Sequence, residues 1–318
     1  MIEAKTKAKV KAQSRWWLKL LAGVAVVGVL TAGYVYLLGS ARTLPTGRLR
    51  VVAGENFWGD IAAQIGGDRV EVISIISDPS ADPHLYESDA RAAAAVAAAR
   101  LVIVNGLGYD DFMTKLLSTG ANGQRDVVTT AAAAGVSGGG GGAGANPHLW
   151  YDLGYVRKVA AAIEADLAAA DPAGAAVYRE NRQKFDDSLA PITETIDRIK
   201  SKYPGAPVAY TESVPAYLLN AAGLTVKTPA AFARAVADGV DPAPADVIAM
   251  NNLLSAKSVR VLLYNSQTTS PITQQARDLA KRSGVPVVGV SETLPRGEAD
   301  YQSWQLDQAK AILNALGG

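Results

Sequence analysis

The sequence predicts an α/β fold of two doubly wound lobes with parallel sheets, joined by one long helix, with a ligand cleft between the lobes. From residue 49 onward, short apolar runs alternate with alanine-rich helical stretches, which is the pattern of parallel strands connected by helices. The alternation occurs twice, and about thirty residues with helical spacing separate the two series. Ligands of such folds bind at the C-terminal ends of the strands, so functional side chains are expected there.

The first series ends in a glycine-rich loop. Strands are expected at 49–54, 70–76, 101–106 and 126–129, and helices at 57–65 and 88–99. Residues 137–145 contain six glycines, which are too free in conformation to form a packed element. This segment is therefore predicted to be a flexible surface loop.

A linking helix and the second series follow. Helices are expected at 153–170 and 173–202, and we expect Pro191 to kink the longer one. The second series has expected strands at 207–212, 225–228, 259–265 and 285–290, and expected helices at 214–222, 243–255, 271–283 and 301–316. The predicted domains are an N-terminal lobe at 49–172, a linking helix at 173–203 and a C-terminal lobe at 204–318.

The residues before the first lobe predict a membrane segment. Residues 1–19 carry six basic residues and one acidic residue, and residues 20–39 carry no charge over a length that spans about 30 Å of hydrocarbon. The positive-inside rule places residues 1–19 in the cytoplasm and the lobes outside it, in the periplasm or on the outer face of the membrane. Residues 20–39 are thus a transmembrane anchor or a signal peptide, and we favour the anchor because the apolar run exceeds the usual ~7–15 residue signal core. Residues 40–48 form a tether.

Composition excludes several classes of function. The formal net charge is only +1, and outside residues 1–19 there remain 25 of the 31 basic and 29 of the 30 acidic residues. Nucleic acid is not an expected partner, because its phosphates favour a strongly basic protein. The chain has no cysteine, which excludes disulfides, thiolate metal sites, cysteine nucleophiles and lipid attachment at cysteine.

The two histidines of the chain occur in nearly the same local sequence. They lie in Asp82-Pro83-His84-Leu85-Tyr86 and in Asn146-Pro147-His148-Leu149-Trp150. Neutral imidazole is the commonest protein ligand for transition metals, so this matched pair predicts a metal site. Two histidines leave a four-coordinate site two donors short, and without cysteine these are carboxylate, amide or water. The carboxylate candidates near predicted strand ends of the second series are Glu212 and Glu292.

From about residue 50 to the C-terminus, the sequence resembles the metal-binding cluster of ABC-transporter solute-binding proteins, the zinc and manganese receptors. The segments that carry this resemblance are 57–62, 65–68, 82–86, 101–108 and 146–150. The resemblance implies a cleft site with one ligand from each of four loops, namely His84, His148, Glu212 and Glu292. It further implies a monomeric, non-enzymatic receptor that captures one divalent ion outside the cytoplasm and delivers it to a membrane permease.

Three features depart from the family's usual pattern. Glu292 stands where the family usually has the shorter aspartate. The glycine run replaces a loop that is rich in histidine and acidic residues in many zinc receptors, and the membrane segment replaces a cysteine-linked lipid. Two imidazoles with two carboxylates accommodate Mn²⁺ or Fe²⁺, while Zn²⁺ binds the same donors more tightly at equal availability, which leaves the metal open.

Two other functions fit the same residues. A metal-dependent hydrolase would use two histidines and one carboxylate to hold a zinc-bound water, with the second carboxylate as base. A receptor would instead close all coordination positions with protein groups. A metal-free, adhesin-like binding module with the same fold would bind no ion at all.

Overall fold

The computed structural model describes residues 47–78, 86, 88–119, 122–138 and 145–318. The segments 1–19 and 20–39, most of the tether, His84 and most of the glycine-rich loop lie outside these residues, so the predictions for them are not addressed by the structure. Among the described helices, none combines the length and the apolar character that crossing a membrane requires. Residues 48–318 form one structural unit.

The N-terminal sheet has four parallel strands in the order β2-β1-β3-β4. The strands are β1 (Leu49–Glu55), β2 (Val70–Ile76), β3 (Leu101–Val104) and β4 (Asp126–Thr129). Val51 of β1 lies opposite Val72 on one side and Leu101 on the other. Strand order reverses between β1 and β3, which makes the C-terminal ends of these two strands a topological switch point.

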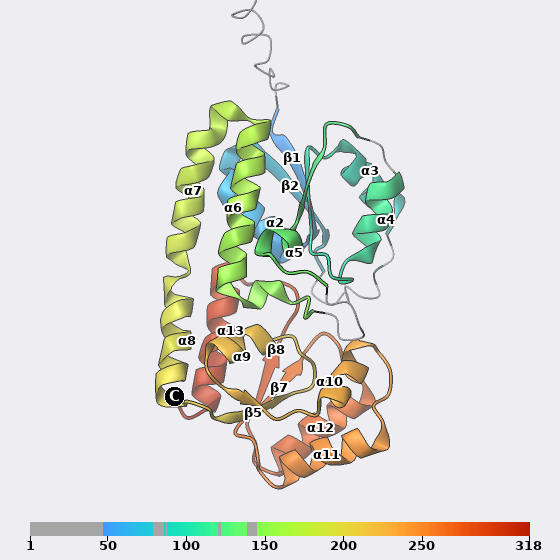
Figure 1. The fold of residues 1–318 in the computed structure, drawn as a ribbon, viewed down its shortest axis with the longest axis vertical. Helices are drawn as coiled ribbons and strands as arrows, with labels where there is room; N and C mark the ends of the chain where they lie inside the picture. Colours follow the sequence, from blue (N-terminus) through green and yellow to red (C-terminus); the bar gives the residue numbers. More distant parts are fainter. Residues whose placement is uncertain (1–46, 79–85, 87, 120–121, 139–144) are drawn as a thin grey trace, which may run out of the picture. The chain divides into compact units, whose positions relative to one another are not determined.

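Helices on both faces of this sheet complete the first half of the unit (Figure 1). They are α2 (Asn56–Gly66), α3 (Ala90–Ala98), α4 (Asp111–Thr119), α5 (Thr130–Ala134) and α6 (Leu153–Ala170), with 3-10 turns η1 (Gly67–Arg69) and η3 (Leu149–Tyr151). The sequence analysis missed α4 and α5. The apolar residues of α4 do lie on one face and pack into the core, but nine residues give the helical period little room to repeat. At five residues, α5 is shorter than two helical turns.

The linking segment is interrupted near its middle, as predicted. A 3-10 turn, η4 (Pro172–Gly174), leads into α7 (Ala175–Ser188), and α8 (Ala190–Lys202) follows after Leu189. Pro191 lies in the first turn of α8, where its missing N–H would have no intrahelical partner. The two helices run end to end along both halves of the unit (Figure 1).

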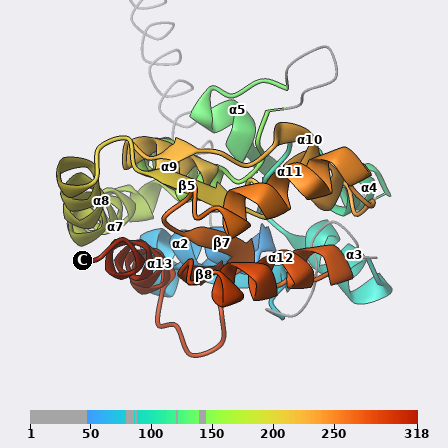
Figure 2. The same ribbon diagram turned by 90° about the horizontal axis from the view of Figure 1, so that it is seen from below.

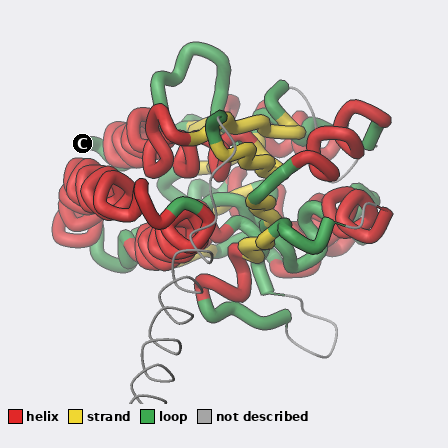
Figure 3. The backbone as a smooth tube through the Cα atoms, turned by 90° about the horizontal axis from the view of Figure 1, so that it is seen from above, coloured by secondary structure: helices red, strands yellow, loops and turns green. Residues whose placement is uncertain are grey.

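The C-terminal sheet repeats the topology of the first. Its parallel strands β5 (Pro207–Tyr210), β6 (Thr225–Val226), β7 (Leu262–Asn265) and β8 (Val287–Val290) have the order β6-β5-β7-β8. Its helices are α9 (Ala216–Ala221), α10 (Ala230–Ala237), α11 (Pro244–Ser255), α12 (Pro271–Arg282) and α13 (Tyr301–Ala315). The sequence analysis missed α10, which buries Phe232 and Val236 in the core of this half. Helices surround the strands of both sheets (Figure 3).

The last helix, α13, connects the two halves. It packs along α8 and also contacts α2, and Figure 2 shows it beside both. The Tyr301 backbone N–H donates to Asp60 Oδ2 at 2.9 Å, and the Tyr301 hydroxyl donates to the Trp150 carbonyl at 2.5 Å. The Trp304 ring packs 6.1 Å from Phe57, centroid to centroid. An aromatic cluster of Phe57, Trp58, Trp150 and Trp304 is thus fully buried. The predicted boundaries at 49–172, 173–203 and 204–318 stay a prediction.

Candidate metal centre

His148 is held in one orientation by the residues that precede it. The Asn146 side chain donates through Nδ2 to the Ser213 carbonyl at 2.9 Å, so its Oδ1 faces His148. This oxygen accepts from the His148 backbone N–H and lies 2.5 Å from His148 Nδ1. Because an amide oxygen can only accept, the proton of the neutral ring is assigned to Nδ1 and the lone pair to Nε2. His148 is 2% exposed, and its Nε2 makes no hydrogen bond with the described residues.

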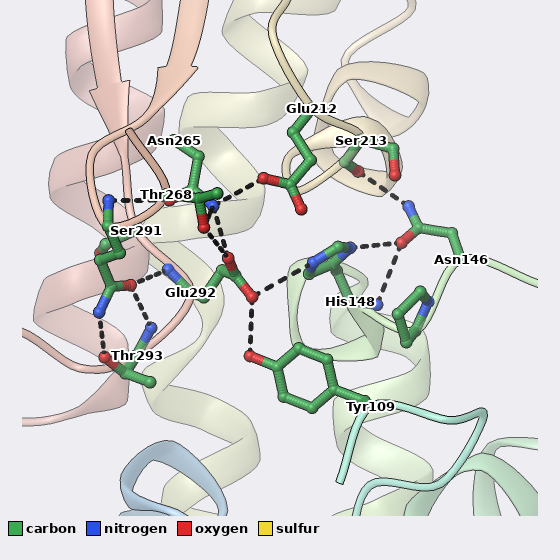
Figure 4. A network of polar contacts seen from close by, with 12 residues as sticks. Tyr109, Asn146, His148, Glu212, Ser213, Asn265, Thr268, Ser291, Glu292 and Thr293 are labelled. Atoms are coloured by element: carbon green, nitrogen blue, oxygen red, sulfur yellow. Dashed lines mark hydrogen bonds and ion pairs between the residues drawn. The ribbon is translucent and has the colours of Figure 1, made fainter. Parts of the chain in front are cut away.

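Two carboxylates from the second half face this nitrogen. Glu212 lies two residues after β5 and Glu292 two residues after β8, and they are 2% and 0% exposed. One potential ligand atom from each of His148, Glu212 and Glu292 lies within 4.8 Å of the others. His148 Nε2 is 3.6 Å from Glu292 Oε2, and Figure 4 shows the three side chains converging.

Neutral donors support both carboxylates. Asn265, the last residue of β7, donates through Nδ2 to Glu212 Oε2 at 2.8 Å and to Glu292 Oε1 at 2.5 Å. Tyr109 donates its hydroxyl to Glu292 Oε2 at 3.0 Å. Burial raises the pKa of Tyr109 well above its usual range, and the nearby charge of Glu292 adds to this effect, so the phenol stays protonated and remains a donor.

The backbone around Glu292 is fixed as well. Gln267 Oε1 accepts from the backbone N–H groups of Glu292 and Thr293, at 2.5 and 2.9 Å. The Tyr151 hydroxyl donates to the Ser291 carbonyl at 2.7 Å. Hydrogen bonds to the backbone before and after Glu292 therefore fix the loop from which its carboxylate projects.

This arrangement suits a divalent cation. Burial of two carboxylates is costly unless a positive charge compensates them. The buried Nε2 without a hydrogen bond supplies a lone pair on the same side as the carboxylates. One imidazole nitrogen and two carboxylate oxygens are ligands that Zn²⁺, Mn²⁺ and Fe²⁺ accept, and they converge without a side chain having to move far.

The structure brings three of the four predicted ligands together and does not describe His84. Sequence reasoning missed Asn146, Tyr109 and Asn265. Asn146 could have been found because it stands two residues before His148. Asn265 could have been found because it lies at the end of a predicted strand, and Glu212 was selected by the same criterion. No sequence signal distinguishes Tyr109, since its role depends on the approach of a loop 183 residues away.

A further buried acid, Glu55, ends β1 in the first half. It is 0% exposed, and neither carboxyl oxygen has a hydrogen-bond partner among the described residues. Burial raises the pKa of Glu55 well above its usual range, and the charge of Asp110 raises it further. Glu55 therefore differs from Glu212, to which Asn265 donates.

Comparison with known proteins identifies similar chains. The model of a protein family described as ZnuA, the periplasmic component A of a zinc-uptake complex, matches residues 51–315. The chain is 30% identical over 148 residues to the manganese-binding lipoprotein MntA of Halalkalibacterium halodurans, covering 46% of this chain and 48% of that one. It is 28% identical over 164 residues to the iron-binding protein YfeA of Yersinia pestis, covering 49% and 51%. The matches thus span about half the length of these two relatives.

A solved structure has the same fold. The periplasmic zinc binding protein TroA from Treponema pallidum superimposes with a TM-score of 0.71 at 20% sequence identity. The match covers 85% of this chain and 99% of that one. At this identity the comparison establishes the architecture of the two sheets and the linking helices.

Proposed function

Because the chain belongs to the ZnuA family of periplasmic zinc-uptake components, we propose that it is the solute-binding receptor of a metal ABC transporter. It captures a divalent transition metal outside the cytoplasm and delivers the ion to a membrane permease. The observation that carries this proposal is the buried cluster of His148, Glu212 and Glu292, in which Nε2 of the histidine has no hydrogen bond to the part of the chain that the structure describes. The family consists of binding proteins, not enzymes.

The proposed ligands are His84 and His148 from the N-terminal lobe, and Glu212 and Glu292 from the C-terminal lobe. The ion lies in the cleft between the lobes, which follow the domain boundaries predicted above. The imidazoles bind the ion first, and the two carboxylates then complete the shell from the opposite side. The Tyr109 hydroxyl links the two sides of the proposed site, since it donates across to Glu292.

The proposed substrate is one Zn²⁺ or Mn²⁺ ion, and Fe²⁺ fits the same donors. The similar proteins MntA, YfeA and TroA are described as manganese-, iron- and zinc-binding, which matches this range of metals. The ion is bound as cargo, so protein groups fill the coordination positions and no reactive water is retained. This distinguishes the receptor from the metal-dependent hydrolase considered above.

The proposed location is the periplasm or the outer face of the cytoplasmic membrane. Residues 20–39 would anchor the chain there, with residues 1–19 inside the cell and the tether leading to the lobes. A monomer is sufficient, because one chain supplies the whole proposed ligand set. The permease is the proposed protein partner.

Metal analysis of the full chain in detergent tests this function. The protein is stripped with a chelator, offered equal Zn²⁺ and Mn²⁺, dialysed and analysed for metal, beside a variant that combines His84→Ala and His148→Ala. We expect one ion per chain in the wild type and none in the variant. A folded wild-type protein that retains neither ion would refute the receptor and favour the metal-free binding module.

A further inference from the structure

Asn265 stands between the two carboxylates and joins loops that are far apart in the sequence. It is 2% exposed at the C-terminal end of β7, the strand that separates β5 from β8 in the sheet. Its Nδ2 contacts Glu212 Oε2 and Glu292 Oε1, and Thr268 Oγ1 lies 3.1 Å away (Figure 4). A single amide nitrogen is thus the shared partner of both acids.

The orientation of this amide follows from its surroundings. Asn265 Oδ1 accepts the backbone N–H of Gln267 at 3.0 Å. A backbone N–H can only donate, so the oxygen must occupy this side of the amide and the NH₂ group must face the carboxylates. An NH₂ group has two protons, and the two shortest of its three contacts are those to the acids, at 2.5 and 2.8 Å against 3.1 Å to Thr268.

The amide thereby divides the four carboxylate oxygens into two pairs. One oxygen of each acid, Glu212 Oε2 and Glu292 Oε1, receives a proton from Asn265. Glu292 Oε2, which also accepts the Tyr109 hydroxyl, lies 3.6 Å from His148 Nε2, and the other oxygen of Glu212 points toward the same ring (Figure 4). Each acid is therefore oriented to meet an ion with one oxygen.

One oxygen from each acid sets a low coordination number. With two imidazoles the shell holds four donors, the tetrahedral number that Zn²⁺ takes in closed protein sites. Mn²⁺ favours six donors that are mainly oxygen, which here would require both oxygens of a carboxylate or additional water. The buried positions of His148, Glu212 and Glu292 leave little access for water.

We propose that Asn265 is a specificity-determining residue, which holds Glu212 and Glu292 to one-oxygen coordination and thereby favours Zn²⁺ over Mn²⁺. This inference rests on the proposed function, since it takes His84, His148, Glu212 and Glu292 as the ligands. Asn265 is a positioning residue, because it acts on the metal through the two acids.

Two substitutions of Asn265 test the inference in the full chain. Asn265→Ala removes the amide, and Asn265→Asp keeps its size and its acceptor for Gln267 while replacing the NH₂ group by a carboxyl oxygen. The exposed Asn252→Ala on α11 makes the same chemical change as the first variant in the same half of the protein. Dissociation constants for Zn²⁺ and for Mn²⁺ are measured by chelator competition, after circular dichroism has confirmed that each variant is folded.

We expect the preference for Zn²⁺ over Mn²⁺ to fall by about 10-fold or more in both Asn265 variants, the size usual for groups that orient metal ligands. Asn252→Ala should keep the wild-type ratio. X-ray absorption of the zinc-loaded wild type should show four nitrogen or oxygen ligands at about 2.0–2.1 Å, and the manganese-loaded variants should show more ligands than four.

Other outcomes separate this inference from the proposed function. A ratio that stays within about 2-fold of the wild type in a folded Asn265 variant would overturn the inference, even if both affinities fall, because an equal loss is what a purely structural role produces. If Asn265→Ala does not fold, the isosteric Asn265→Asp decides the question. A wild type that binds neither ion would overturn the proposed function and the inference with it.

Discussion

The two sheets have the same strand order, yet the acids at their strand ends differ in their hydrogen bonds. β1 and β5 occupy the same position in their sheets. Glu55 is the last residue of β1, and Glu212 lies two residues after β5. An asparagine stands at the end of the next strand in both sheets, Asn105 after β3 and Asn265 in β7. The two halves thus present a glutamate and an asparagine at matching switch points.

The side-chain amides of these two asparagines donate to different groups. Asn265 donates to Glu212, whereas Asn105 donates to the carbonyls of Gly106 and Pro147 and accepts the Trp58 indole N–H. Glu55 receives no such donor from the described residues, and burial raises its pKa. A strand-end position at a switch point is therefore not enough to make an acid a metal ligand. The acids of the proposed site differ from Glu55 in accepting a hydrogen bond from a neighbouring amide.

Loss of a proposed ligand from either half should have the largest effect. Structural zinc sites have binding free energies of about 10–16 kcal/mol, so one of four ligands accounts for about 3 kcal/mol, or roughly 100-fold in affinity. We expect His148→Ala and Glu212→Gln each to weaken metal binding by at least about this factor. Chelator competition measures the change, and the exposed Glu194→Gln on α8 serves as the matched control. Full affinity in either variant would show that one half alone holds the ion.

The raised pKa of Glu55 predicts an effect on folding with a defined pH dependence. Its folded pKa is raised, so stability is present below the unfolded value near 4.5 and is lost as pH rises toward the folded pKa. Glu55→Gln has no proton to lose and should be more stable than the wild type at pH 8, and the difference should shrink as the pH falls toward 4.

Urea denaturation of metal-free protein at several pH values measures this difference. The exposed Glu194→Gln should show no comparable pH-dependent gain. A Glu55→Gln variant that is less stable than the wild type at pH 8 would mean that the Glu55 carboxylate is charged and stabilised by a partner, and the contrast between the two halves would disappear.

The contact between Tyr109 and Glu292 should have the smallest effect of the three. Tyr109→Phe keeps the ring and removes the hydroxyl that donates to Glu292 Oε2, so we expect a loss of about 10-fold in metal affinity. Because the phenol pKa lies far above neutrality, this loss should be the same at pH 7 and pH 8.5. A loss that grows with pH over this range would indicate that the hydroxyl ionises and acts as a ligand.

Much of the architecture could be predicted because it depends on local patterns. The eight strands, the break before Pro191 and the approach of Glu212 and Glu292 follow from apolar runs, proline geometry and strand ends. The short helices α4, α5 and α10 were missed because the helical period has little or no room to repeat in nine, five and eight residues. The roles of Tyr109 and Asn265 depend on contacts between distant loops, and these exist only once the chain is folded.

Helix α13 has a consequence for the order in which the molecule can fold. Trp304 packs against Phe57, and Tyr301 donates to the Trp150 carbonyl, so the aromatic cluster of the first half is completed by residues near the end of the chain. A ribosome that has released only the first 290 residues has therefore not yet supplied this part of the core. Such a nascent chain exposes large aromatic surfaces, and it must be kept from aggregating until the final helix arrives.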